Sequence, residues 1–246
     1  MAKRSLKKRT SKKKGPPKER NLSRTDIKTI IKRMTSTRIE TKHYTKNWAA
    51  TVQSGAVWMA NPFDALAQGT GANNLIGDIL HLDSLKVSIT IYSDLVSDVI
   101  NYRVMGFWCD MKLPMQAGTN PSTGNSWQQI PIADIVTSKS PFIGPVGPGE
   151  VINLFPDPVE QPQIAFDSRG KLQAGYSGQK TQNVFNKTVY FKNKKCVYQH
   201  AAGGYSWFSG KNFYIWLISE NASGVTPETT SSIKAKMVFE VKYKDG

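Results

Sequence analysis

The chain has 246 residues and contains 33 Lys or Arg against 18 Asp or Glu, which gives a net charge of +15. Residues 1–46 contain 17 of the basic residues and three of the acids, so they carry +14 while the other 200 residues carry +1. This asymmetry excludes a uniformly basic enzyme and indicates that a terminal arm binds a polyanion. No apolar run approaches the length that spans a membrane, and the basic N-terminus lacks the apolar segment of a secretory signal.

Residues 1–22 are predicted to form a disordered basic arm. Residues 1–20 contain ten Lys or Arg and one acid, and apart from Met1, Ala2 and the prolines the only apolar residue is Leu6. Such a segment repels itself and buries too little surface to offset its ordering entropy. Its flexible cations are expected to neutralise phosphates without reading a base sequence. The candidate nucleic-acid-binding residues of the arm and of the helix that follows are Lys3, Arg4, Lys7, Lys8, Arg9, Lys12, Lys13, Lys14, Lys18, Arg20, Arg24, Lys28, Lys32 and Arg33.

Residues 23–41 are predicted to form a short amphipathic basic helix and a linker. Ser23 is a suitable N-cap, and Asp26 stands at the position of the acidic residue in a capping box. Two functions are open for this helix: its apolar side packs on a partner while the cations face phosphate, or its basic side is simply solvated. The apolar residues with helical spacing are Ile27, Ile30, Ile31 and Met34.

Residues 42–246 are predicted to form one all-β domain. Residues 78–94 and 233–244 alternate between apolar and polar side chains, as half-buried strands do. Residues 101–110 and 213–220 are apolar on both faces, which predicts strands that are covered on both sides. Roughly eight strands with uneven connections favour a sandwich, of which the eight-stranded jelly roll is one form. The other predicted strands are residues 47–60, broken at Ser54-Gly55, and residues 163–166, 171–174, 184–191 and 196–200.

A long excursion separates the two groups of strands. Residues 113–128 are rich in turn residues, residues 132–136 could form a short helix, and residues 141–162 contain nine Pro and Gly and should be irregular. An excursion of this length within a compact domain usually carries function or a contact between subunits.

The sequence contains no pattern typical of an enzyme, and no cofactor is predicted. Cys109 and Cys196 lie in apolar strands, where buried free thiols are favoured over a disulfide, and neither has the spacing of a zinc ligand. Asp94 and Asp98 flank a turn, so a calcium site between subunits is conceivable, although solvated turn acids are favoured. No metal-binding residue is therefore assigned.

Two further groups have open interpretations. Six aromatic residues between 205 and 216 could stack on bases, but core and subunit-interface roles explain most of them better. A second basic group either contacts phosphate or forms an ordinary exposed strand face. This group consists of Lys187, Lys192, Lys194 and Lys195.

The order of these parts resembles the capsid proteins of small icosahedral viruses. A Lys/Arg tail, the helix sequence TDIKTIIKRM and a run of strands are similar to the satellite necrosis virus type. Residues Gly77–Val87, with the pattern G-D-I-x-x-L-x-S-L-x-V, and Asn101–Val104, NYRV, are similar to capsid proteins of circular single-stranded DNA viruses of the circovirus-like kind. The resemblance implies a jelly roll that assembles into a closed icosahedral shell, with the arm inside on the genome.

The hypothesis from the sequence is therefore a non-enzymatic viral capsid protein in the virion. Its expected partners are copies of itself, 60 in a closed T=1 shell, and a single-stranded genome, with DNA favoured over RNA; no host attachment factor is identified. The basic arm could also act as a nuclear localisation signal during assembly in a host nucleus. The alternative is a single-stranded nucleic-acid-binding protein on a β-barrel scaffold, whose body would need its own basic, aromatic-lined groove.

Overall fold

A computed structural model describes the chain in segments. The described residues are 23–38, 40–53, 56–63, 66, 68–71, 74–93, 99–110, 127–131, 142–143, 154–158, 161–173, 182–200, 206–221 and 232–245. The chain divides after Ile39: helix α1 (Arg24–Arg38) belongs to the first part, and every described strand belongs to the second. The predicted disordered arm, residues 1–22, and the predicted short helix, residues 132–136, lie outside the described residues.

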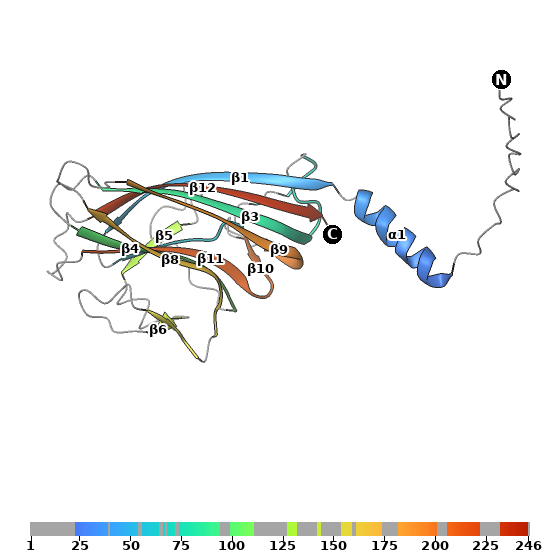
Figure 1. The fold of residues 1–246 in the computed structure, drawn as a ribbon. Coiled ribbons are helices and arrows are strands. Elements are labelled where there is room, and N and C mark those ends of the chain that lie inside the picture. Colours follow the sequence, from blue (N-terminus) through green and yellow to red (C-terminus); the bar gives the residue numbers. More distant parts are fainter. Residues whose placement is uncertain are drawn as a thin grey trace, which may run out of the picture. The chain divides into compact units, whose positions relative to one another are not determined.

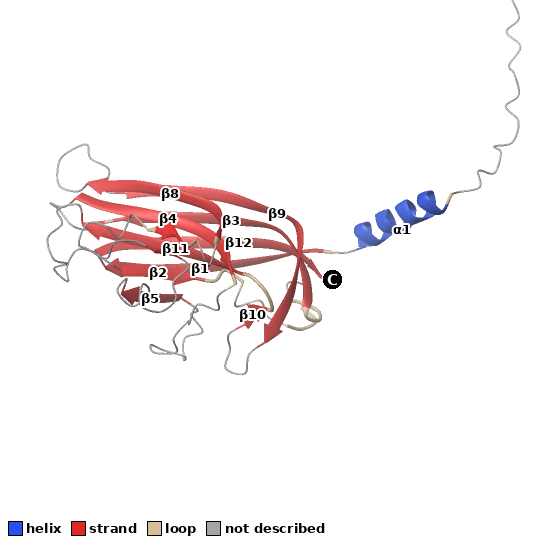
Figure 2. Ribbon diagram, turned by 90° about the horizontal axis from the view of Figure 1, so that it is seen from below, coloured by secondary structure: helices blue, strands red, loops and turns tan. Residues whose placement is uncertain are grey.

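Two antiparallel sheets of five strands each pack face to face (Figure 1). The first sheet has the order β1-β12-β3-β9-β10, with bounds Thr41–Gln53, Ser232–Asp245, Ile79–Tyr92, Gln182–His200 and Ser206–Phe208. The second sheet has the order β5-β2-β11-β4-β8, with bounds Trp127–Pro131, Ala56–Ala60, Asn212–Asn221, Val99–Cys109 and Gln163–Gln173. Figure 2 shows the strands of both layers running along the same long direction.

Four nested ladders define the topology. β1 pairs with β12, β2 with β11, β3 with β9 and β4 with β8, each antiparallel. The ladders β12·β3 and β11·β4 then join these pairs into the two sheets. A chain whose first strand pairs with its last, and so on inward, is a jelly roll. The predicted fold class is therefore confirmed; β5 and β10 are added at the sheet edges.

The inward side chains of both sheets form one large core. On β3 these are Leu85, Val87, Ile89 and Ile91, which the period of two in the sequence assigned to one face. On β12 the inward residues are Ile233, Ala235, Met237, Phe239, Val241 and Tyr243, and all are buried. Burial of this alternating set removes the apolar side of each strand from water, which is the main force that holds the sheets together.

A second apolar cluster lies on the opposite, outward face of the second sheet. Phe107 of β4 and Trp216 of β11 contact Phe142 there, with ring centroids 4.8 and 5.1 Å apart. Phe142 belongs to β6 (Phe142–Ile143), which pairs with β7 (Phe155–Pro156). The excursion thus supplies the cover that the two-sided apolar pattern of β4 and β11 predicts, although the Pro and Gly content of residues 141–162 predicts irregular chain there.

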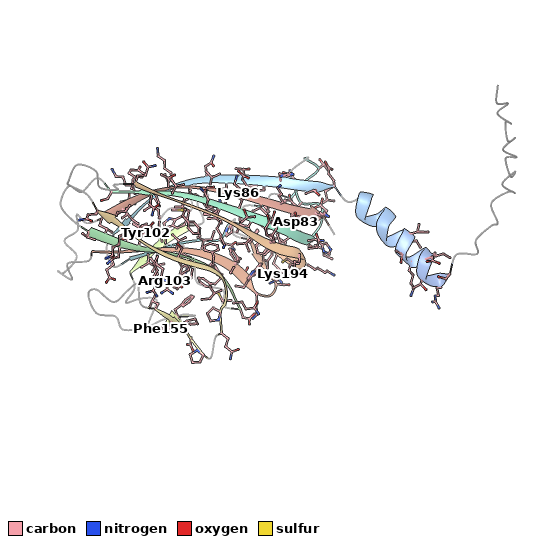
Figure 3. All side chains as sticks on the ribbon, in the orientation of Figure 1. Asp83, Lys86, Tyr102, Arg103, Phe155 and Lys194 are labelled. Atoms are coloured by element: carbon pink, nitrogen blue, oxygen red, sulfur yellow. The ribbon has the colours of Figure 1, made fainter. Side chains whose placement is uncertain are left out.

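Arg103 links the excursion to the second sheet by hydrogen bonds. Its Nε donates to Asp167 Oδ1 at 2.8 Å and its Nη2 to Asp167 Oδ2 at 2.6 Å, while Nη1 donates to the Leu154 carbonyl oxygen at 2.9 Å. A buried guanidinium needs its charge and its donors satisfied, and this bidentate pair with a backbone acceptor does so. Figure 3 shows Arg103 on the side of the second sheet that also carries Phe155.

Two pairs of predicted strands are single strands in the structure. Residues 163–166 and 171–174 belong to one edge strand, β8, whose polar centre contains Asp167. Residues 184–191 and 196–200 belong to one long strand, β9, which is irregular but unbroken at Lys192 and Asn193, where φ is 53° and 58°. In both cases a local polar or turn-like segment made one strand look like two in the sequence. Pairing with the neighbouring strand keeps the strand continuous across that segment.

Both cysteines are buried and free, as predicted. Burial raises the pKa of the Cys196 thiol to about 11, and the nearby Lys194 opposes that shift only in part. Because the thiolate is the reactive form, a raised pKa and little exposure both make the thiol slow to react.

We therefore expect Cys109 and Cys196 of the native protein to react slowly with a thiol reagent at pH 8, and both to react fully in urea. A Thr45→Cys variant, with its new thiol on an exposed strand position, is the positive control and should react quickly when native. Rapid labelling of two thiols per native wild-type chain would contradict the buried environment.

Candidate nucleic-acid interface

Helix α1 begins with the capping box that the sequence predicted. The Ser23 backbone N–H donates to Asp26 Oδ2 at 3.1 Å, and the Asp26 N–H donates to Ser23 Oγ at 3.2 Å. These bonds satisfy donors that the first helical turn leaves without partners, and the carboxylate also interacts favourably with the helix dipole. The local sequence is thus sufficient to explain where the helix begins.

The apolar side of α1 is exposed in its own unit. Ile27, Ile30 and Ile31 are 45%, 41% and 58% exposed. Of the candidate cations, Arg24 and Lys28 are exposed on the helix, whereas Lys32 and Arg33 are helical but their side chains lie outside the described residues. The ten candidates between Lys3 and Arg20 also lie outside them, so their role stays a prediction.

Strand β1 begins at Thr41, so the basic segment joins the jelly roll at one end of the first sheet. Lys42, only 5% exposed, points inward there and forms an ion pair with Asp245 at 2.5 Å. Its Nζ also donates to the Asn74 carbonyl oxygen at 2.5 Å. The two contacts hold the start of the first strand against the last strand and against a loop.

The outward face of the first sheet carries a row of lysines. β12 presents Lys234, Lys236, Lys242 and Lys244 outward, as its alternation predicted, and β3 and β9 add Lys86 and Lys195. We call these six residues the lysine face. Figure 3 shows Lys86 on the side of the first sheet that points away from Arg103.

Two acids lie within this face. Glu240 of β12 forms an ion pair with Lys86 at 3.3 Å, and both side chains are about half exposed. Asp83 is the extra residue at the register shift of β3, beside Ser84. Exposed pairs of this kind contribute little to stability because water screens them.

The other described outward residues of β1 and β3 are mainly hydroxyl and amide side chains: Thr45, Asn47, Thr51, Ser88 and Thr90.

The second basic group of the sequence does not lie on one face of the sheet. Lys187, Lys192 and Lys195 are exposed, but Lys194 is half-buried with Nζ 3.5 Å from the centroid of the Trp108 ring. Burial is the main cause that lowers the pKa of Lys194, with the charges of its neighbours making smaller contributions in both directions. Lys194 therefore stabilises the end of the sandwich by a cation–π contact.

The aromatic cluster does not form a base-stacking surface in the part that the structure describes. Phe208, Phe213, Tyr214 and Trp216 are all buried, in agreement with the favoured core interpretation. Trp207 lies in β10, but its side chain is outside the described residues, as is all of Tyr205. The most exposed described aromatic is Tyr190 of β9, at 74%, which no sequence pattern singled out.

The described residues contain no group of three or more acids, His or Cys that could hold a metal ion. Asp94 and Asp98, the conceivable calcium ligands, lie outside the described part of the chain. Among the described helices, none has the length and apolar character to cross a membrane.

The jelly-roll class rests on strand order, and comparison with known proteins adds a distant likeness. No family model and no curated protein matches the chain. Among solved structures, the chain is similar in fold to viral capsid proteins, including the 60-mer capsid protein of BFDV, a circovirus, at 8% identity over 85% of this chain and 93% of that one, with a TM-score of 0.33.

Two other viral structures are similar at the same distant level. One is Desmodium yellow mottle tymovirus, at 8% identity over 95% of each chain and a TM-score of 0.34. The other is a T=3 Penaeus vannamei nodavirus, at 11% identity over 99% of this chain and 62% of that one, with a TM-score of 0.29.

The structure predicts that Lys42 stabilises the fold. Lys42→Met keeps the buried stem but leaves the Asp245 carboxylate, which is 19% exposed, without its cation. We expect a loss of about 2–3 kcal/mol in the free energy of unfolding, below the range for fully buried pairs because Asp245 is partly solvated. Urea unfolding followed by tryptophan fluorescence measures this loss.

The matched control is Lys86→Met, which breaks an ion pair between half-exposed side chains. It should cost less than about 1 kcal/mol. Equal destabilisation by the two variants would contradict the role of Lys42.

Proposed function

We propose that this chain is a viral capsid protein that assembles into a small closed shell and packages a single-stranded genome through its basic N-terminal arm. The observation that carries this proposal is the junction at Thr41, where residues 1–40, with a net charge of +12, meet a jelly roll with a net charge of only +3. A near-neutral body allows copies to pack without mutual repulsion, while the arm neutralises phosphate.

In this mechanism the arm and the body have separate tasks. The candidate cations from Lys3 to Arg33 bind the genome backbone as a flexible polycation, without base readout. The jelly roll forms the shell, and its side chains need no catalytic role. Residues 1–22, residues 23–41 and residues 42–246 are then the arm, the helix with its linker and the shell domain. We favour DNA over RNA, a T=1 shell of 60 copies, and a nuclear localisation role for the arm.

The alternative is a single-stranded nucleic-acid-binding protein that does not form shells. It would bind through a groove of the body lined by aromatic rings, so removal of the arm would leave most of its affinity. The buried state of Phe208, Phe213 and Trp216 removes three of the side chains that such a groove would have used.

Assembly is tested by electron microscopy of the purified full-length chain. We expect uniform, small, closed particles, since a shell requires every copy to make the same set of contacts. A protein that remains as single chains at every salt concentration and pH tried would contradict the capsid function and favour the alternative.

The role of the arm is tested by deletion of residues 1–20. This removes ten basic side chains and one acid, so packaged nucleic acid, measured by the ratio of absorbance at 260 and 280 nm, should fall to a small fraction of the wild-type amount. The body should still fold, because its strands begin at Thr41.

The matched control for the arm replaces Lys7, Lys8, Lys12, Lys13 and Lys14 with Arg. Charge is retained, so packaging should stay close to wild type, whereas the same five changes to Gln should reduce it. Normal packaging by the deletion variant would show that the arm is not the binding element.

A further inference from the structure

We propose that the lysine face of the first sheet is a second binding surface for the backbone of single-stranded nucleic acid. The inference rests on the proposed function, because it takes the polyanion held by the arm as the occupant. The face consists of Lys86, Lys195, Lys234, Lys236, Lys242 and Lys244.

The first observation is how unevenly the body distributes its charge. Six lysines against Glu240 and Asp83 give the face a net charge of +4. Because residues 47–246 total +1, the rest of that segment carries −3. The near-neutral body is therefore not uniformly neutral, and its positive charge is gathered on one side of one sheet. A surface of this kind attracts phosphate and repels an equally basic surface of another copy.

The second observation is the position of this face relative to Thr41, the first residue of the jelly roll. Thr41, the first residue of β1, pairs with Lys244, which pairs with His81, which pairs with Lys195. This row crosses four strands and lies where the basic segment enters the body. A nucleic acid that the arm has bound is held on the same chain as this sheet, which raises its effective concentration at the lysine face.

The third observation is the extent and chemistry of the surface. From Lys234 to Lys244 the outward residues of β12 span about 33 Å, since a strand advances about 3.3 Å per residue. Outward Thr, Ser and Asn side chains of β1 and β3 flank the lysines, and hydroxyls and amides are common phosphate donors. Tyr190, opposite Ser84 at the edge of this face, exposes a ring on which a base can stack.

The test compares two double variants of the full-length chain that remove the same amount of charge. Lys236→Gln/Lys242→Gln alters the face, and Lys171→Gln/Lys187→Gln alters exposed lysines elsewhere: Lys171 lies on the second sheet, and Lys187 is in register with the inward Val87. The probe is a fluorescent oligothymidylate of about 30 nucleotides, titrated across a salt series.

The face pair should lower the slope of log affinity against log salt by about 1.4, at about 0.7 for each phosphate that is no longer neutralised. At physiological salt this corresponds to a roughly tenfold weaker affinity, whereas the control pair should change affinity by about twofold at most. Equal behaviour of the two pairs would overturn the inference.

The same titration includes the five-Lys→Gln arm variant, which separates the two hypotheses. If the arm variant binds more weakly while the face pair behaves as its control does, the face is not a binding surface and the proposed function of the arm stands. If the arm variant binds as the wild type does, the proposed function fails, and with it the basis of this inference.

Lysine acetylation read by mass spectrometry identifies what covers the face. We expect Lys236, Lys242 and Lys244 to be protected when the oligonucleotide is added, and Lys171 to be acetylated equally with and without it. Protection of the three lysines by assembly alone, with no nucleic acid present, would make the face a contact between copies and would overturn the inference.

Discussion

The pairing of β1 with β12 is the interaction on which the rest of this structure depends. The two strands come from opposite ends of the jelly roll, and their ladder runs without a break from Thr41↔Lys244 to Gln53↔Ser232. β12 also pairs with β3, so it connects the first strand to the remainder of its sheet. Its inward side chains fill the core and its outward lysines form the basic surface, which makes one strand responsible for both stability and charge.

Closing such a sheet brings together residues that are about 200 positions apart, which costs loop entropy that only the final core can offset. The buried ion pair of Lys42 with Asp245 lies at the end of this long-range ladder. Removing two charges from water costs free energy, and the short contact together with the extra hydrogen bond of Lys42 offsets that cost. The location of this pair at the start of β1 holds the beginning of the jelly roll against the last strand.

The centre of the second sheet is apolar on both of its faces, so each face needs a cover. β4 and β11 are apolar on both faces, and a sandwich covers only one face of each sheet. Phe142 and Leu154 from the excursion bury the other face, and Arg103 binds the backbone of Leu154 as well as Asp167. The long insertion therefore completes a second core, so packing accounts for part of its length.

The sequence by itself determined the features whose causes are local. The charge of the arm, the capping box of α1 and the period of two in β3 and β12 each depend on neighbouring residues, and the structure agrees with them for α1, β3 and β12. The burial of Cys109 and Cys196 followed from the apolar strands around them. The sandwich class also followed, because alternation and turn residues mark most strands of the main core. The strand count did not follow: the sequence predicts roughly eight strands, and the described residues contain twelve.

Only the tertiary structure decided how distant residues meet. The continuity of β8 and β9, the cover of the second sheet by Phe142, and the partner of Arg103 depend on pairing between segments with no local signal of contact. The lysine face is of the same kind. Alternation placed four of its lysines on one side of β12, but Lys86 and Lys195 joined them only through the registers of β3 and β9, since cross-strand neighbours are set by the global fold.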